Sequence, residues 1–234
     1  MKLLTKYIFL LGGLVSICSC SVIEKSSMHG FESGYYTFKS DKSEIKQVYA
    51  DLTDDKIDVY RIKENQIDNI MMTIPFLTSD SLFDHSIKFS ERSLDIDIST
   101  ILFKYRPSVY ELPPQLITDF NVALFAGLRH DDYHIKVRKD PLGNYHNGII
   151  NRGYDFGIFA GPGTTLISPF TTQNSISDEY NGFIFQFGVA GFIESNVASF
   201  GIATGFDYLL SPDRKIWIYN KKPWVGFIIG IALN

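Results

Sequence analysis

The stretch NGFIFQFGVAGFI, residues 181–193, places an apolar side chain at every second position. Phe183, Phe185 and Phe187 share one face of an extended chain, and the other face carries Gly, Ala, Gln and two larger apolar residues. A period of two is typical of a β-strand, in which successive side chains point to opposite faces. Residues 198–210 and 225–234 repeat the pattern. The last third of the chain therefore predicts three consecutive β-strands.

The second face of these strands is small, glycine-rich and almost uncharged. Between Tyr180 and Leu210 the only charged residues are Glu194, in a turn, and Asp207. A soluble antiparallel sheet carries Lys, Glu and Thr on its solvated face. A small transmembrane barrel instead directs large apolar side chains to lipid and small or polar ones into a narrow lumen. The pattern favours the transmembrane arrangement.

Three further segments alternate in the same way: Ser93–Arg106, Gln115–His130 and Asn151–Ile167. In the first of them the alternation changes phase at Phe103-Lys104-Tyr105-Arg106, which indicates a β-bulge or the water interface. Six long strands are therefore predicted. Gly161-Pro162-Gly163-Thr164-Thr165 lies within the third segment and lacks the lysine of a phosphate loop. Its glycines are better explained by close strand packing or curvature.

Shorter and more charged strands are expected at Gly34–Lys39, Lys46–Leu52 and Lys56–Ile62. They either form a small sheet at the membrane surface or line part of the barrel, and Lys63–Arg92 is expected to be loop with one irregular strand or short helix. Closure of an outer-membrane barrel usually needs at least about eight strands. We therefore expect an all-β fold, an antiparallel up-and-down β-barrel of about 8 to 12 strands with a charged N-terminal β segment.

The N-terminus has the order of a secretory signal: two lysines, an apolar run from Tyr7 to Ile17, then small residues. Its end, Ile17-Cys18-Ser19-Cys20, resembles the lipobox of bacterial lipoproteins, with Cys20 as the lipidated residue. Cleavage near Ser19 to Ser21 without a lipid is the alternative. Ser21, rather than Asp, favours the outer membrane over inner-membrane retention. We expect residues 1–19 to be removed, 20–33 to be a tether, 34–92 the N-terminal β segment and irregular region, and 93–234 the barrel core.

Composition excludes several classes of protein. Removal of the signal takes two of 22 basic residues and no acids, so 20 basic minus 26 acidic residues gives a net charge of −6. That balance argues against nucleic acid as a partner. No cysteine follows Cys20, which excludes disulfides, thiol catalysis and cysteine metal sites from the mature chain. No apolar run after the signal approaches the length of a transmembrane helix.

Loop lengths give an expected topology. The tight turn Glu194-Ser195-Asn196 should face the periplasm, as should the end of the chain, whereas the polar loops Ser168–Glu179 and Ser211–Arg214 should face outward. Lys139–Ile150 then falls on the periplasmic side despite its length, which suggests an extra hairpin around Tyr133–Arg138. An interfacial aromatic girdle is expected from Trp217, Tyr219 and Tyr208, with Lys221 and Lys222 near the head groups.

The small-residue face also carries a set of polar side chains that strand closure would bring into one lumen. They are Asp95, Asp97, Asp119, Asn121, Arg129, Asp155, Gln186 and Asp207. Charges confined in this way must be paired. The favoured interpretation is a salt-bridged and hydrogen-bonded plug that holds a narrow barrel together. The functional interpretation is a cation-preferring constriction or a ligand site.

Two other constellations are weaker. His130, Asp132 and His134 would share a face at the spacing of a strand and are the only candidates for a metal site, although a solvated loop is the favoured interpretation. Ser199 lies on the small-residue face, but no histidine follows His146 and no Gly-x-Ser-x-Gly elbow is present. We therefore expect no catalysis, no metal and no cofactor.

The lipobox-like start, the alternating strands and the ending Lys222–Asn234, KPWVGFIIGIALN, together resemble the small outer-membrane β-barrel proteins and lipoproteins of Gram-negative bacteria of the Bacteroidetes type. That family commonly ends on an aromatic residue, whereas this chain ends Leu233-Asn234. The resemblance implies a lipid-anchored integral protein of the outer membrane with a structural or narrow-pore role. Its partners would be outer-membrane lipid and the barrel-assembly and lipoprotein-sorting machinery.

Two other classes of function remain open from the sequence. A lipid-anchored soluble lipocalin-like barrel would bind a hydrophobic ligand and hold its large apolar residues inside. A lipid-modifying outer-membrane enzyme would need a Ser/His pair. The direction of the Phe183, Phe185 and Phe187 face separates the first two classes, because outward side chains fit a membrane barrel and inward ones a soluble barrel.

Overall fold

The computed structural model describes residues 30–40, 43–64, 66–78, 87–110, 112–193 and 199–232. The predicted signal, Cys20 and most of the tether lie outside these ranges. The described chain is 74% strand and 4% helix. Its twelve strands, β1 to β12, join in one antiparallel sheet, which confirms the predicted fold class.

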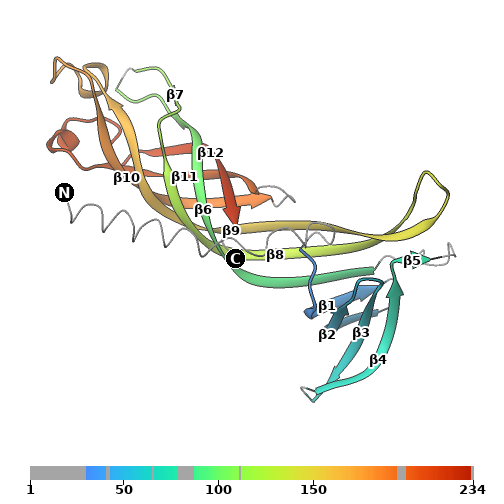
Figure 1. Ribbon diagram of the computed structural model, residues 1–234. Helices are drawn as coiled ribbons and strands as arrows, with labels where there is room; N and C mark the ends of the chain where they lie inside the picture. The colour runs from blue at the N-terminus through green and yellow to red at the C-terminus, as the bar shows by residue number, and fades with distance from the viewer. Residues whose placement is uncertain are drawn as a thin grey trace, which may run out of the picture.

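Six long strands follow one another around a ring (Figure 1). Neighbours along the chain pair with each other, and the last strand pairs back with the first, from Val225 opposite Tyr105 to Ala232 opposite Asp97. The ring is closed over only part of the length of its strands. Its members are β6 (Ile87–Arg106), β8 (Val122–Lys139), β9 (Tyr145–Ile167), β10 (Tyr180–Ile193), β11 (Ser199–Leu209) and β12 (Pro223–Ala232).

The phase change predicted in β6 is a real irregularity of register. Odd-numbered residues of this strand face into the ring from Asp95 to Ile101, then Leu102 and Phe103 both face outward. The pairing of β12 with β6 shifts at the same place, between Phe227 and Ile228. Lys104 and Arg106 consequently point into the ring, as expected for side chains that follow a β-bulge.

Glycines on the inner face allow the strands to approach one another closely. A Cβ on Gly161 would lie 2.2 Å from the carbonyl oxygen of Val122, and one on Gly188 would lie 2.1 Å from that of Thr204. No side chain fits at these distances, so only glycine permits the tight curvature of a six-stranded ring. The Gly161-Pro162-Gly163 segment lies within β9, where close strand packing explains it.

The N-terminal strands lie outside the ring. They are β1 (Gly34–Ser40), β2 (Ser43–Leu52), β3 (Lys56–Lys63) and β4 (Gln66–Pro75), and they pair in that order. The first three match the predicted segments, and β4 falls in the region expected to be loop with one irregular strand or short helix. β1 also pairs with residues 88–90 of β6, so the small sheet joins the ring through one shared strand.

The first residues of β6, the last of β8 and the first of β9 extend beyond the ring as a three-stranded arm (Figure 1). The N-terminal sheet packs on this arm around a core that includes Tyr36, Val48, Ile57, Phe89 and Tyr133. The extra hairpin predicted at Tyr133–Arg138 is therefore wrong, because these residues continue β8 and only residues 140–144 turn the chain. The predicted boundary between residues 92 and 93 falls inside β6.

The two ends of the ring differ. One end carries β7 (Gln115–Ile117), η2 (Phe170–Thr172) and η3 (Pro212–Lys215), and we call it the mouth. The arm and the end of β12 lie at the opposite end, which we call the waist (Figure 1). The loops predicted to face one side, Ser168–Glu179 and Ser211–Arg214, do share the mouth. Residues 194–196, predicted as a turn at the other end, lie outside the described ranges. The short β5 (Leu77–Thr78) pairs with β9 on the arm.

Candidate functional site

The outer surface of the ring is apolar on all six strands. Phe183 is 69% exposed, and Phe185 and Phe187 are each 45% exposed, so the face that distinguishes the two barrel classes points outward. We call the whole surface the apolar belt. It consists of Ile96, Ile98, Leu102, Phe103, Leu124, Leu128, Phe156, Ile158, Leu166, Phe183, Phe185, Phe187, Val189, Phe200, Ile202, Phe206 and Val225.

The middle of the ring is filled by side chains. Phe125, Phe159, Phe192 and Trp224 form a buried cluster with Ile101, Ile228 and three alanines. The rings of Phe125 and Phe192 meet edge to face with their centroids 4.8 Å apart. A narrow ring of this kind is a packed core.

The predicted lumen polar cluster divides into separate groups. Asp95, Asp97, Asn121, Asp155, Gln186 and Asp207 are buried, whereas Asp119 and Arg129 are half-buried. Asp95, Asp97 and Asp155 lie toward the waist, where Arg129 is opposite Asp155 in the register of β8 and β9. Arg129 also binds Asp131, with Nε 2.6 Å from Oδ2. Five carboxylates and one guanidinium therefore do not form a single cluster.

Asp207 is the centre of a buried ion cluster near the mouth. Its Oδ1 accepts hydrogen bonds from Lys104 Nζ at 2.8 Å and from Trp224 Nε1 at 2.9 Å, and its Oδ2 accepts one from Arg106. All three charged side chains are at most 3% exposed. Charges this far from water persist only when they are paired and hydrogen-bonded. The cluster joins β6, β11 and β12, and its two cations outnumber its one anion.

Lys104 and Arg106 were missing from the predicted cluster. The sequence did contain a signal, since the phase change after Leu102 places even-numbered residues of β6 on the inner face. Arg106 also lies 4.9 Å from the ring of Trp217 and 5.0 Å from that of Tyr219. Both aromatic residues are buried in the cluster that closes the mouth. Their predicted place in an interfacial girdle is therefore wrong.

Two amides of the predicted cluster bind main-chain groups. Gln186 Nε2 donates to the carbonyl oxygens of Val122 at 3.2 Å and Pro162 at 3.3 Å, and Asn121 Nδ2 donates to the carbonyl of Asp119 at 2.6 Å. The bonds of Gln186 connect β10 with β8 and β9 beside the ion cluster, because Gln186 is opposite Asp207 in the sheet. They serve the packing of the ring, in agreement with the plug interpretation.

His130, Asp132 and His134 share a face of the arm, as predicted. Asp132 is already bound by Lys88 Nζ at 2.6 Å, by Ser90 Oγ at 2.7 Å and by His130 Nε2 at 3.2 Å. Partial burial, with Lys88 next in effect, lowers the pKa of His134 below its ordinary value. No group of three or more His, Cys, Asp or Glu residues in the described ranges could hold a metal ion.

Ser199 and a histidine are not brought together. Ser199 is buried on the inner face, opposite Gly230 of β12. His130 lies on the other face of β8, where its ring is 5.1 Å from that of Tyr154.

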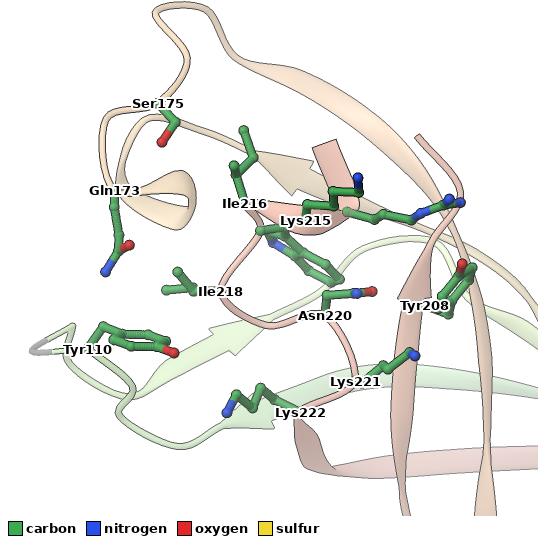
Figure 2. Close-up of a pocket in the computed structure, with 12 residues that line it drawn as sticks. Tyr110, Gln173, Ser175, Tyr208, Lys215, Ile216, Ile218, Asn220, Lys221 and Lys222 are labelled. Atoms are coloured by element: carbon green, nitrogen blue, oxygen red, sulfur yellow. The ribbon is translucent and has the colours of Figure 1, made fainter. Parts of the chain in front are cut away.

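A hollow of 580 Å³ lies at the mouth (Figure 2). It is lined from three loops, by Tyr110, by Gln173 and Ser175, and by residues between Tyr208 and Lys222. We call it the mouth pocket. Among the residues that the structure describes, its lining contains four cations, Arg214, Lys215, Lys221 and Lys222, and no acid. Trp217, which contacts Arg106 of the ion cluster, also lines it.

No family model, no curated protein and no solved structure matches this chain. Among the residues that the structure describes, no helix is long and apolar enough to cross a membrane. Function is therefore argued from the belt, the filled interior and the mouth pocket.

Proposed function

We propose that the six-stranded ring is embedded in the outer membrane of a Gram-negative bacterium, where the protein is a structural β-barrel, anchored in addition by a lipid on Cys20. The observation that carries the proposal is the apolar belt, which is continuous over all six ring strands. Monomeric soluble proteins rarely expose so large a contiguous apolar surface. Lipid can cover such a surface, because its hydrocarbon tails are as apolar as the exposed side chains and no hydrophobic effect drives those side chains into a core.

The height of the belt fits a bilayer. From Phe183 to Ile193 a strand advances about 33 Å at roughly 3.3 Å per residue. A tilt of about 40° reduces this to a height of ~25 Å, the height of the apolar band of outer-membrane barrels. All backbone groups in the paired part of the ring are satisfied within the sheet, as a hydrocarbon environment requires.

The arrangement of faces is the reverse of that in a lipocalin-like barrel. Phe183, Phe185 and Phe187 would fill the ligand cavity of such a protein, but here they point outward, and packed side chains such as Phe192 fill the interior. The filled interior favours a structural role over a narrow pore. Asp207, paired with Lys104 and Arg106, ties three strands of the ring together.

An orientation follows from the two ends of the ring. β1 begins near the waist, so a tether from a lipid on Cys20 reaches the fold on that side. We infer that the waist, the arm and the N-terminal sheet face the periplasm and that the mouth faces outward. Barrel-assembly and lipoprotein-sorting machinery would then be the partners in biogenesis.

Alkaline extraction of membranes tests the proposal. The full chain and its Cys20→Ser variant are expressed with their own signal in a Gram-negative host, and membranes are washed at high pH. Both forms should stay in the pellet, because an integral ring does not depend on the lipid anchor. Release of Cys20→Ser into the supernatant would show that the ring is not inserted.

Conductance separates a structural ring from a pore. The refolded chain in a planar bilayer should be silent, since aromatic side chains occupy the ring interior. Reproducible single-channel steps from correctly inserted protein would contradict the structural role while leaving membrane insertion in place.

A further inference from the structure

We infer that the mouth pocket binds a phosphomonoester group, either that of a lipid head group or that of a small soluble molecule. This inference goes beyond the proposed membrane insertion and does not depend on it. It rests on the charges of the pocket, on the aromatic ring between two of them and on the backbone of its lining.

The charges of the pocket are of one sign. Arg214, Lys215, Lys221 and Lys222 line it, and none of them has a carboxylate partner among the described residues. Asp213, which precedes Arg214, accepts a hydrogen bond from Tyr180 at 2.6 Å and does not line the pocket. The ion cluster below adds a net positive charge, because Lys104 and Arg106 share one carboxylate. Together these groups create a positive potential over the pocket.

Two of the cations are held on one aromatic ring. The guanidinium of Arg214 lies 5.8 Å and the ammonium of Lys221 lies 5.5 Å from the centre of the Tyr208 ring. Cation–π attraction positions both groups before any ligand arrives. Two positive charges beside one aromatic side chain repel each other, and an anion bound between them removes this repulsion. A dianion with several acceptor oxygens satisfies both at once, and this is the charge pattern of a phosphomonoester.

The backbone of the lining is unusual. The described residues contain five non-glycine residues with positive φ, and three of them line the pocket: Tyr110 (φ 49°), Gln173 (φ 52°) and Lys221 (φ 58°). Side chains rarely adopt this region, and residues held in it cluster at binding sites. The three residues come from two different loops and the segment after η3, so the strain is concentrated at this pocket rather than in one turn. Figure 2 shows Tyr110 and Gln173 on one side of the pocket and Tyr208 on the other.

The size of the pocket suits a phosphorylated group with part of its carrier. A volume of 580 Å³ falls within the range of small-molecule sites, roughly 300–1,000 Å³. Tyr110, Trp217 and Ile218 add apolar surface beside the cations, which a bare inorganic ion would not use. A head group or a phosphorylated small molecule would use both parts.

Calorimetric titration of the full chain in an uncharged maltoside detergent tests the inference. The probes are inorganic phosphate, dioctanoyl phosphatidic acid, which is a phosphomonoester lipid, and dioctanoyl phosphatidylglycerol, an anionic lipid without a monoester. The Arg214→Gln/Lys221→Gln variant should lose affinity by about tenfold or more, because two charge-assisted hydrogen bonds are removed. The matched control, Arg61→Gln/Lys63→Gln, removes the same charges from exposed positions of β3 and should bind as the unmodified chain does.

The probes also identify the source of the group. Binding of inorganic phosphate that depends on Arg214 and Lys221 supports a small soluble ligand, and binding of phosphatidic acid alone supports a lipid head group. Equal affinity for phosphatidic acid and phosphatidylglycerol, equal loss in the two double variants, or no binding of any phosphomonoester would overturn the inference. Alkaline extraction of the Arg214→Gln/Lys221→Gln variant should be unchanged, so the two proposals can fail separately.

Discussion

The ring and the N-terminal sheet both place apolar residues at every second position. They differ in which face of the strands, the buried or the exposed one, carries these residues. In the N-terminal sheet the large apolar residues, such as Phe38, Val48 and Ile57, are buried in a core. In the ring, large apolar residues such as Phe183 and Ile202 also cover the outward, exposed face. The period of two therefore identifies strands in both regions. The composition of the face opposite the large apolar residues indicates whether those residues point into a core or outward.

The ion pairs of the two regions also differ in their exposure to water. The N-terminal sheet pairs Lys56 with Asp58 at 2.7 Å, with the lysine side chain 40% exposed. The ring pairs Lys104 and Arg106 with Asp207 out of contact with water. The first pair is screened by solvent and contributes little, whereas breaking the second leaves unpaired buried charge.

Asp207→Ala should have the largest effect. It leaves Lys104 and Arg106 without a counterion inside the ring, so the free energy of unfolding should fall by about 3–5 kcal/mol. Urea titration of the refolded protein in detergent measures this. Asp58→Ala in the N-terminal sheet is the control and should cost much less. Equal losses for the two variants would mean that the ring interior is hydrated.

Phe187→Arg tests the solvent of the apolar belt. In a bilayer it should destabilise the ring by about 2–4 kcal/mol, because the charge must enter hydrocarbon. Ile70→Arg, at a 54% exposed position of β4, should change stability by about 0.5 kcal/mol or less. Unfolding in phosphatidylcholine vesicles compares them. Two small effects would indicate that water surrounds both regions.

Gly188→Ala tests the narrowness of the ring. The new Cβ would lie 2.1 Å from the carbonyl oxygen of Thr204, so β10 and β11 must separate, at about 1–3 kcal/mol. Gly148→Ala on the arm is the control. Its Cβ would come no closer than 3.4 Å to the flexible side chain of Arg138, so the substitution should be nearly neutral. Denaturation midpoints of the two variants give the comparison, and a neutral Gly188→Ala would show that the ring is looser than described.

Acid should slightly lower the local stability of β3 and β4 in the N-terminal sheet. The hydrogen bond from Lys56, followed by that from Thr73, lowers the pKa of Asp58 below its ordinary 3.8. A carboxyl pKa that is lower in the folded state stabilises the fold at pH values above the unfolded-state pKa. This contribution is lost as the pH falls through the folded-state pKa. The protection of β3 and β4 amides from hydrogen exchange, relative to the intrinsic rate at each pH, should therefore fall below about pH 4. In Asp58→Asn this part of the pH dependence should be absent; persistence of the full dependence would assign it to other groups.

The sequence predicted the local elements of this fold well because they depend on alternation alone. Six long strands, three N-terminal strands and the irregularity after Leu102 all correspond to features of the structure. The outward direction of Phe183 followed from the glycine-rich face opposite it. These are properties of neighbouring residues, and a period of two records them directly.

Long-range features were not predictable in the same way. That six strands suffice for the ring depends on the pairing of β12 with β6, which no local pattern encodes. β8 and β9 extend into the arm because Tyr133 and Ile149 find a core supplied by the N-terminal sheet. Trp217 and Tyr219 turn inward because Arg106 offers its guanidinium to their rings, and the mouth pocket exists only where three loops meet.

The shared edge of β6 has a consequence for the order of assembly. Residues 88–90 of this edge pair with β1, and residues from Asp97 onward pair with β12. The first contact spans about 50 residues, whereas the second, between Asp97 and Ala232, spans 232 − 97 = 135. Non-local pairings form late, because the entropy of closing a long loop must be lost first. The small sheet is thus expected to form early and to hold β6 as the template on which the last strand completes the ring.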